Sequence, residues 1–279
     1  AVAFLLEAEG KRVFYTGDFR ATGRKRVLYE NLLKRPPEDI DLLITEGTMM
    51  SRFHELARTE EELQQELTTR LLESDKLAYV FGSGQHLDRF VTVYKAAKDS
   101  KRTLVVDLYV AWVLKQLKRN HNNIPQPGWP FLRVKHWLFH IDRLKEAGES
   151  DFFLRLGKHK VDVNEIAEHP SHYVFYSSAN SLYQAILKKL PKPDAVDFYW
   201  SMWKGYLDRD EKVKPYASKH GIAIEHLHTS GHATRVHLKQ MIDALSPDRL
   251  LPVHTFAPEE FAGLHDNVVE LDDGETVEV

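Results

Sequence analysis

Cysteine is absent from the 279 residues of the chain. Its absence excludes disulfide bonds and thiolate metal ligands, so any metal ion would have to be bound by histidine and carboxylate side chains. Long apolar runs are missing as well: none approaches the roughly 18 residues that a membrane-spanning helix needs, and the first residues lack the pattern of a signal peptide. We therefore expect a soluble protein without a membrane partner, and we place it in the reducing cytoplasm.

An excess of charge of one sign is also missing. The chain has 38 Lys and Arg residues against 41 Asp and Glu residues, which gives a formal net charge of -3. This balance argues against a broad electropositive face, but it leaves room for nucleic acid bound in a local groove or around a metal site. Histidine is plentiful instead, with 15 residues. Because histidine is the commonest metal ligand and the usual proton shuttle near neutral pH, its positions carry the functional argument.

Two acidic residues follow apolar strands in the first part of the chain. Residues 2–8 and 12–16 predict two strands joined by a hairpin turn, and Asp18 comes just after the second. Residues 41–45 predict a buried strand that ends at Glu46. A carboxylate at the end of a strand is a common metal ligand, although spacing alone favours an ordinary turn at Asp18.

Strands and helices alternate through the middle of the chain, which is typical of a parallel sheet with crossover helices and predicts an α/β fold. The expected strands are 76–81, 102–108, 173–176 and 194–201, and the expected helices are 59–73, 86–98, 110–118, 181–189 and 208–219. Residues 119–170 contain many Pro, Asn and aromatic residues and predict a long irregular insertion. Its aromatic side chains would stack on bases or, with better reason, pack inside a small domain.

The stretch 222–237, IAIEHLHTSGHATRVH, predicts a strand, a Thr-Ser-Gly turn and an amphipathic helix. His232 lies at this junction, where side chains reach over the end of a sheet and the first N–H groups of a helix attract anions. A polar turn that caps the helix through Thr229 or Ser230 explains the same residues equally well.

The last part of the chain predicts a strand at 249–253, a short helix at 258–265 and a terminal hairpin at 267–279 that turns at Asp272-Asp273-Gly274. The strand at 249–253 ends at His254. Four residues thus follow apolar strands, and their side chains would converge at one edge if the strands form one sheet: Asp18, Glu46, His232 and His254. Two carboxylates and two imidazoles suit a hard or borderline divalent cation and general acid–base catalysis.

Four segments, in this order along the chain, resemble the motifs of one family: AVAFLLEAEGKRVFYTGDFR, DLLITEG, HTSGHA and LPVHT. The family is the β-CASP branch of the metallo-β-lactamase superfamily, the nucleases that include ribonuclease J. The resemblance implies the C-terminal half of a metallo-β-lactamase αββα sandwich, formed by residues 1–50 and 195–279. It also implies an inserted β-CASP α/β domain at residues 51–194.

The resemblance implies a role for each candidate residue. Asp18 would bridge two divalent metal ions, with zinc expected and manganese as the alternative, and His254 would be a ligand of the second ion. Glu46 would be hydrogen-bonded to His232, which would raise the pKa of the imidazole and let it protonate the leaving oxygen. Ser230 and the backbone around Gly231 would contact a phosphate of the substrate.

One part of the family pattern is missing. The principal metal motif, His-x-His-x-Asp-His, does not occur, and the His-x-His pair at His226 and His228 is in the wrong place and is better explained as half-buried polar residues. The missing ligands would lie upstream of Ala1. We therefore interpret the chain as N-terminally truncated, and we expect this polypeptide alone to be inactive.

The expected function of the full-length protein is metal-dependent phosphodiester hydrolysis by an RNA-processing exo- or endoribonuclease. RNA is preferred to DNA because, in the family, histidine at the position of His254 accompanies RNA processing and valine accompanies DNA repair. A DNA nuclease of the same family and a catalytically inactive scaffold or binding subunit are the alternatives. A hydrolase of small esters or lactams is a third, which the long insertion disfavours. A homo-oligomer stays open.

Overall fold

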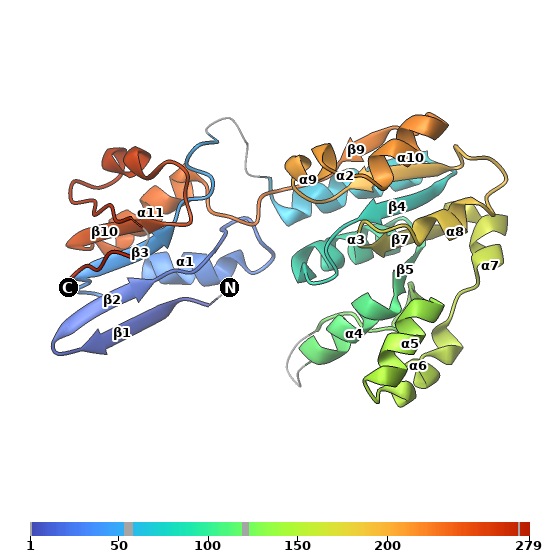
Figure 1. Ribbon diagram of the computed structural model, residues 1–279, viewed down its shortest axis with the longest axis horizontal. Coiled ribbons are helices and arrows are strands. Elements are labelled where there is room, and N and C mark those ends of the chain that lie inside the picture. The colour runs from blue at the N-terminus through green and yellow to red at the C-terminus, as the bar shows by residue number, and fades with distance from the viewer. Residues whose placement is uncertain (1, 53–57, 119–122, 273) are drawn as a thin grey trace. The chain divides into compact units, whose positions relative to one another are not determined.

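The computed structural model describes residues 2–52, 58–118, 123–272 and 274–279, and it has the α/β fold that the strand–helix alternation predicts (Figure 1). The chain divides into two compact units. Unit 1 consists of residues 1–59 and 230–279, and unit 2 consists of residues 60–229 between them. Each unit is built on a sheet of its own.

Unit 1 contains a four-stranded sheet in the order β1-β2-β3-β10. Its strands are β1 (Phe4–Ala8), β2 (Lys11–Tyr15), β3 (Leu42–Glu46) and β10 (Arg249–Val253). Strands β1 and β2 form the predicted antiparallel hairpin, whereas β2, β3 and β10 run parallel. The carboxyl ends of these three strands therefore lie at the same edge of the sheet.

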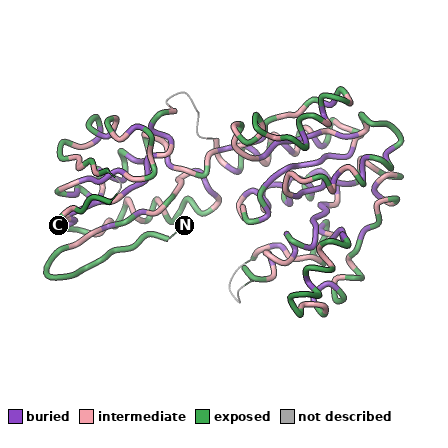
Figure 2. Tube along the Cα trace, in the orientation of Figure 1, coloured by how far each residue is buried: buried purple, intermediate pink, exposed green. Residues whose placement is uncertain are grey.

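The core of unit 1 lies between this sheet and the helices α1 (Arg26–Lys34) and α11 (Arg235–Leu245), with the 3₁₀ helix η3 (Pro258–Gly263) beside them. Helix α11 contributes Leu238, Met241, Ile242 and Leu245, the spacing of one helical face. These side chains pack with Phe14, Leu43 and Leu250 of the sheet. Figure 2 shows β3 largely buried, whereas all five residues of β1 are exposed.

Unit 2 contains six parallel strands in the order β6-β5-β7-β4-β8-β9. The strands are β4 (Leu77–Phe81), β5 (Thr103–Asp107), β6 (Leu132–Lys135), β7 (Tyr173–Ser177), β8 (Val196–Trp200) and β9 (Ile224–His226). Helices of unit 2 are α2 (Glu60–Glu73), α3 (Leu87–Asp99), α4 (Leu108–Leu117), α5 (Leu138–Glu146), α6 (Ser150–Arg155), α7 (Val163–Glu168), α8 (Tyr183–Leu187), α9 (Lys204–Asp208) and α10 (Val213–His220), with 3₁₀ turns η1 (Gly157–His159) and η2 (Pro170–His172).

Strand β4 shows why unit 2 forms a covered parallel sheet. All five of its residues are buried, as expected for a strand with helices on both faces. Ala78 and Val80 belong to one apolar cluster, and Leu77, Tyr79 and Phe81 belong to the other. The two clusters are therefore the two faces of a single sheet, separated by the alternation of side chains along each strand.

The structure places both domain boundaries later in the chain than the sequence prediction, and unit 2 begins at Glu60 rather than at residue 51. Unit 2 ends at Thr229, rather than at 194, because β8 and β9 are hydrogen-bonded into its sheet through β4. The strand that precedes His232 is β9 of the unit 2 sheet, so the condition that the four strands form one sheet is not met for His232.

Two predicted irregular or terminal segments also differ. The predicted irregular insertion at 119–170 contains β6, α5, α6 and α7, although residues 119–122 lie outside the described residues. The terminal hairpin is not formed in the described part of 267–279; Asp273, in its predicted turn, lies outside that part. Instead, the Leu250 amide of β10 donates a hydrogen bond to the backbone oxygen of Asn267, and the Val269 amide donates one to the backbone oxygen of Leu250. These two groups of Asn267 and Val269 therefore bond to β10 and not to a hairpin partner. Among the described helices, none is both long and apolar enough to cross a membrane.

Candidate active site

Three candidate side chains come from the carboxyl edge of the unit 1 sheet. Asp18 lies just beyond β2, Glu46 is the last residue of β3, and His254 follows β10 directly. His232 completes the group: each of the four residues offers one ligand atom, and these atoms lie within 4.8 Å of one another. Within the residues that the structure describes, no other group of histidine, aspartate or glutamate side chains has this property.

His232 reaches this group from the loop between β9 and α11. The cap of α11 is Thr234, whose side-chain oxygen accepts a hydrogen bond from the His237 amide, so the prediction that Thr229 or Ser230 caps the helix is wrong. Ser230 instead accepts a hydrogen bond on Oγ from the amide of His232, at 3.1 Å. The loop is therefore fixed on both sides of His232 by side-chain hydrogen bonds within unit 1.

Glu46 holds the imidazole of His232. The Glu46 side chain is only 1% exposed, and its Oε2 lies 2.7 Å from Nδ1 of His232. Its other oxygen, Oε1, accepts hydrogen bonds from the amides of Phe19 at 2.9 Å and Ala233 at 3.2 Å. Both carboxylate oxygens have partners in the chain and the side chain is almost fully buried, so Glu46 orients His232 and presents no exposed oxygen to a cation.

The hydrogen bond that His232 donates to Glu46 raises the pKa of His232. Partial burial opposes this effect, the negative charges of Glu46 and Asp18 add to it, and the positive charge of Arg52 again opposes it. The His232 side chain is 26% exposed. Since Nδ1 faces Glu46, Nε2 is the ring nitrogen that is left for a proton or a cation.

Asp18 and His254 form the exposed part of the group. Oδ1 of Asp18 lies 2.9 Å from Nδ1 of His254, and the two side chains are 53% and 58% exposed. Thr48 donates a hydrogen bond from Oγ1 to the backbone oxygen of His254 at 3.2 Å. His254 has a φ of +50°, a left-handed conformation that non-glycine residues rarely adopt, and such residues are concentrated at functional sites.

The chemistry of the donors fits a divalent cation in part. A carboxylate oxygen and an imidazole nitrogen, as offered by Asp18 and His254, are ligands that zinc and manganese accept. A catalytic zinc site has about three protein ligands, however, and Glu46 is committed to His232. His232 is the remaining candidate for a third ligand, through Nε2. The described residues thus provide two accessible donors and a third position that either a cation or a proton can occupy.

Two arginines of unit 1 lie at the site and were missed by the sequence reasoning. Nη1 of Arg20 lies 3.4 Å from the backbone oxygen of Ser230, and the charge of Arg52 acts on His232. Arg20 directly follows the TGDF segment, which is the signal that would have pointed to it. Ser230 Oγ accepts a hydrogen bond from the His232 amide and keeps its own proton to donate, and the contact of Ser230 and Gly231 with a phosphate stays a prediction.

The His-x-His pair does not join the four-residue group. His226 is exposed at the end of β9, and its Nε2 lies 2.9 Å from the backbone oxygen of Met202. His228 is half-buried, and burial, followed by the positive charge of Arg89, lowers its pKa to about 3. Both residues belong to unit 2, and neither is a member of the four-residue group. The prediction that both are half-buried is right for His228 and wrong for His226, which is exposed.

Comparison with known proteins supports the fold. No family model matches the sequence, and no curated protein matches it. A solved structure of a protein of unknown function from Enterococcus faecalis V583 is similar over 98% of this chain, with a TM-score of 0.75 and 21% sequence identity. This chain covers 59% of the length of that protein.

Proposed function

We propose that this chain carries part of the active site of a metal-dependent phosphodiester hydrolase, a nuclease of the β-CASP type. The observation that carries the proposal is the pairing of a buried carboxylate with an imidazole beside a second, exposed carboxylate–imidazole pair. Glu46 and His232 are 2.7 Å apart, and Asp18 and His254 are 2.9 Å apart. This arrangement separates proton transfer from cation binding, and phosphodiester cleavage needs both.

In this proposal Glu46 and His232 act as a proton donor. Glu46 fixes the imidazole through Nδ1 and raises its pKa, which favours the protonated ring with an N–H on Nε2. The proton passes from Nε2 to the oxygen that leaves the phosphorus. The amides of Phe19 and Ala233 hold Glu46 in place, so the direction of Nε2 is set by the backbone.

Asp18 and His254 would hold the cation. A bound zinc or manganese ion would supply an activated water and neutralise charge on the phosphate. Thr48 donates a hydrogen bond to the backbone oxygen of His254, which has a left-handed conformation, and the imidazole of His254 lies against Asp18. A complete site with two ions requires ligands beyond these two residues.

RNA is the proposed substrate. The resemblance of the LPVHT segment to RNA-processing members supports RNA over DNA, and Arg20 and Arg52 place positive charge close to His232. The near-neutral net charge fits a polyanion that is bound locally at such a site. The cytoplasm stays the expected compartment.

The test combines metal content with cleavage. We expect the complete protein to cleave single-stranded RNA in the presence of zinc or manganese, and His232→Ala to abolish cleavage while bound metal, measured by plasma mass spectrometry, changes little. Asp18→Asn should lower the affinity for zinc by about tenfold or more, since a carboxylate ligand loses its charge. If His232→Ala loses its metal instead, Nε2 of His232 is a ligand and the assignment as a proton donor is wrong.

A binding subunit without catalysis is the second candidate function. It is favoured by the small number of accessible donors, because Asp18 and His254 alone make an incomplete site. The same experiment separates the two functions: RNA that binds to the complete protein without cleavage, at saturating zinc and at saturating manganese, would support the binding subunit. Matched RNA and DNA oligonucleotides, labelled at either end, would show the preferred sugar and the direction of cleavage.

A further inference from the structure

A fully buried ion pair lies inside unit 2. Arg89 of α3 and Glu60, the first residue of α2, both have side chains that are 0% exposed. Nε and Nη2 of Arg89 each donate a hydrogen bond of 3.1 Å to a separate oxygen of Glu60. Removing two charges from water is costly, and such a pair is often no more stable than apolar side chains of the same volume. Stability alone therefore does not account for its presence.

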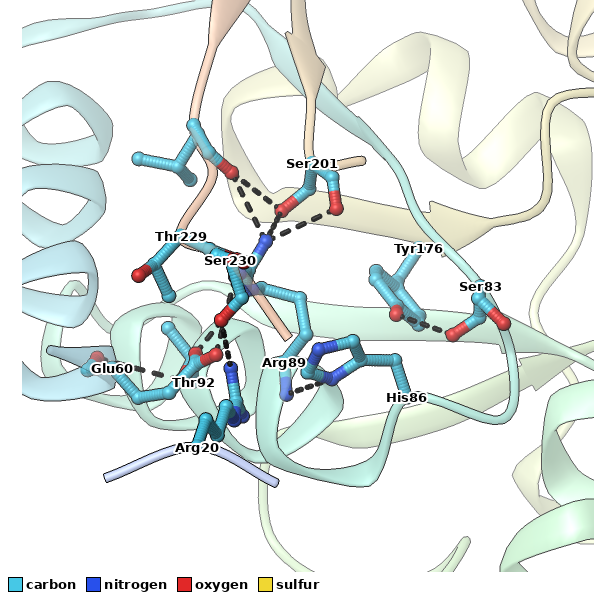
Figure 3. A network of polar contacts seen from close by, with 11 residues as sticks. Arg20, Glu60, Ser83, His86, Arg89, Thr92, Tyr176, Ser201, Thr229 and Ser230 are labelled. Carbon is cyan, nitrogen blue, oxygen red and sulfur yellow. Dashed lines mark hydrogen bonds and ion pairs between the residues drawn. The ribbon is translucent and has the colours of Figure 1, made fainter. Parts of the chain in front are cut away.

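The remaining donors of Arg89 bind the backbone of two other segments (Figure 3). Nη1 lies 3.0 Å from the backbone oxygen of Ser201, 2.5 Å from its Oγ and 3.2 Å from the oxygen of Leu227. Nη2 also lies 3.5 Å from the oxygen of Thr229. A guanidinium has five N–H donors in a fixed plane, and here each has an acceptor. Arg89 is therefore bonded to three separate parts of the chain.

Two of these parts are the ends of unit 2. Glu60 is its first residue and Thr229 is its last, so one guanidinium is bonded to both places at which the chain enters and leaves the unit. Thr92 adds a further bond to Glu60, from its Oγ1 to Oε2 at 2.6 Å. Ser201 adds a further bond to the exit segment, from its Oγ to the oxygen of Leu227 at 2.7 Å. His232 follows only three residues after Thr229.

We propose that Arg89 is a positioning residue, which fixes both chain connections of unit 2 at one buried point and so holds the start of the loop that carries His232. The planar fork of an arginine defines where each acceptor must lie, whereas an apolar cluster would leave the two connections free to shift along one another. Lysine cannot replace it, because its single ammonium group has three donors and cannot bind Glu60 with two parallel bonds. The proposal does not depend on which reaction His232 serves.

Hydrogen exchange in the whole chain, followed by mass spectrometry and by amide NMR, tests this assignment with Arg89→Lys. We expect exchange to rise by about tenfold or more around Glu60 and around Leu227–Thr229 together, since each connection loses a hydrogen bond from a charged donor. The amides of His232 and Ala233, which bond to Ser230 and Glu46 in unit 1, should also exchange faster. That effect would not follow from a loss of unit 2 stability alone.

The matched control is Arg102→Lys. Arg102 is also a buried arginine of unit 2, and it donates to the backbone oxygens of Leu71, Ser74 and Lys76, which belong to neither connection. This variant should raise exchange near residues 71–77 and leave Ala233 unchanged. If Arg102→Lys accelerates Ala233 as much as Arg89→Lys does, or if Arg89→Lys leaves Ala233 unchanged, Arg89 is a structural clamp and the assignment as a positioning residue is wrong.

A milder variant keeps the test decisive if Arg89→Lys does not fold. Ser201→Ala retains the ion pair but removes Ser201 Oγ, which accepts from Arg89 and donates to Leu227. We expect faster exchange at Leu227–Thr229 and at Ala233, with no change around Glu60. Unchanged exchange at Ala233 in this variant would also overturn the proposal.

Discussion

Replacing the carboxylate of Glu46 by an amide of the same shape should lower the pKa of His232. In the wild type, Oε1 of Glu46 accepts the amides of Phe19 and Ala233, and Oε2 faces Nδ1 of His232. In Glu46→Gln the side-chain oxygen is needed by the two amides, so the NH₂ group faces Nδ1. Nδ1 must then be an acceptor, which favours the neutral imidazole and removes the interaction that raises the pKa of His232.

The free energy of unfolding should fall by about 1.5–3 kcal/mol, the usual value of a hydrogen bond to a charged group. The loss depends on pH because the His232 pKa is raised in the folded state. The stabilisation by the charged pair is fully present below the unfolded-state pKa, about 6.5 for histidine, and disappears as the pH rises through the folded-state pKa. The difference between wild type and Glu46→Gln should therefore be largest in mild acid and smaller in alkali.

Two measurements on the whole chain check this prediction. The His232 ring resonance, followed by NMR over a pH titration, should titrate at lower pH in Glu46→Gln than in the wild type, and urea unfolding at acid and alkaline pH gives the free energies. Glu30→Gln is the control, because Glu30 is 47% exposed and pairs with Arg26 in the same helix. An unchanged His232 pKa in Glu46→Gln would refute the reasoning. It would mean that the charge of Asp18, and not Glu46, raises the pKa of His232.

Two further predictions concern packing and acid stability. Gly47→Ala should destabilise unit 1 by about 1–3 kcal/mol in chemical unfolding, because the added Cβ would lie 2.6 Å from Cε2 of the buried Phe261. Gly231→Ala is the control, because a Cβ added there would have no neighbouring atom within 4 Å. His228, whose pKa is lowered to about 3, contributes stability that is present above pH ~6.5 and is lost as the pH falls, by up to about 1.4 kcal/mol per pH unit. His228→Gln should flatten the fall in melting temperature between neutral and acid pH, and an unchanged slope would show that His228 is protonated without cost.

The positions of Glu46 and His254 could be predicted from the sequence because each ends a short, continuous apolar strand. The predicted strand at 249–253 coincides with β10, and the strand predicted at 41–45 overlaps β3. Parallel strands bring their carboxyl ends to one edge, so the proximity of the two residues follows from strand pattern alone. The same reasoning places Asp18 beyond β2.

The sequence pattern does not predict which of the two sheets contains β9. Its three residues, Ile224–His226, show the alternation of a strand but contain nothing that selects the partner sheet. That choice is made by the ladder with β8, whose Phe198 lies opposite Ile224. The end of unit 2 at Thr229 depends on this pairing. The sequence prediction, which lacks the pairing, ends the domain at 194, too early in the chain.

Arg89 was also beyond sequence reasoning. A charged residue in a helix normally indicates a solvent-exposed face, and its partner Glu60 lies 29 residues away. Only the closed fold shows that both side chains are buried and that backbone oxygens from two more segments surround them. Strand β6 was missed for a related reason, since Arg133 and Lys135 interrupt its apolar residues.

The hydrogen bond between Glu46 and His232 has a consequence for synthesis of the chain, because its two residues are 186 positions apart. At about 5–20 residues per second, a ribosome needs about 10–40 s to reach His232 after it has made Glu46. During that time Glu46 emerges without the imidazole it will hold, while the strands of unit 2 can already pair among themselves. Early folding of unit 2 would bring its two ends together and shorten the loop that must close, so a slow-folding unit 2 should delay formation of the Glu46–His232 hydrogen bond.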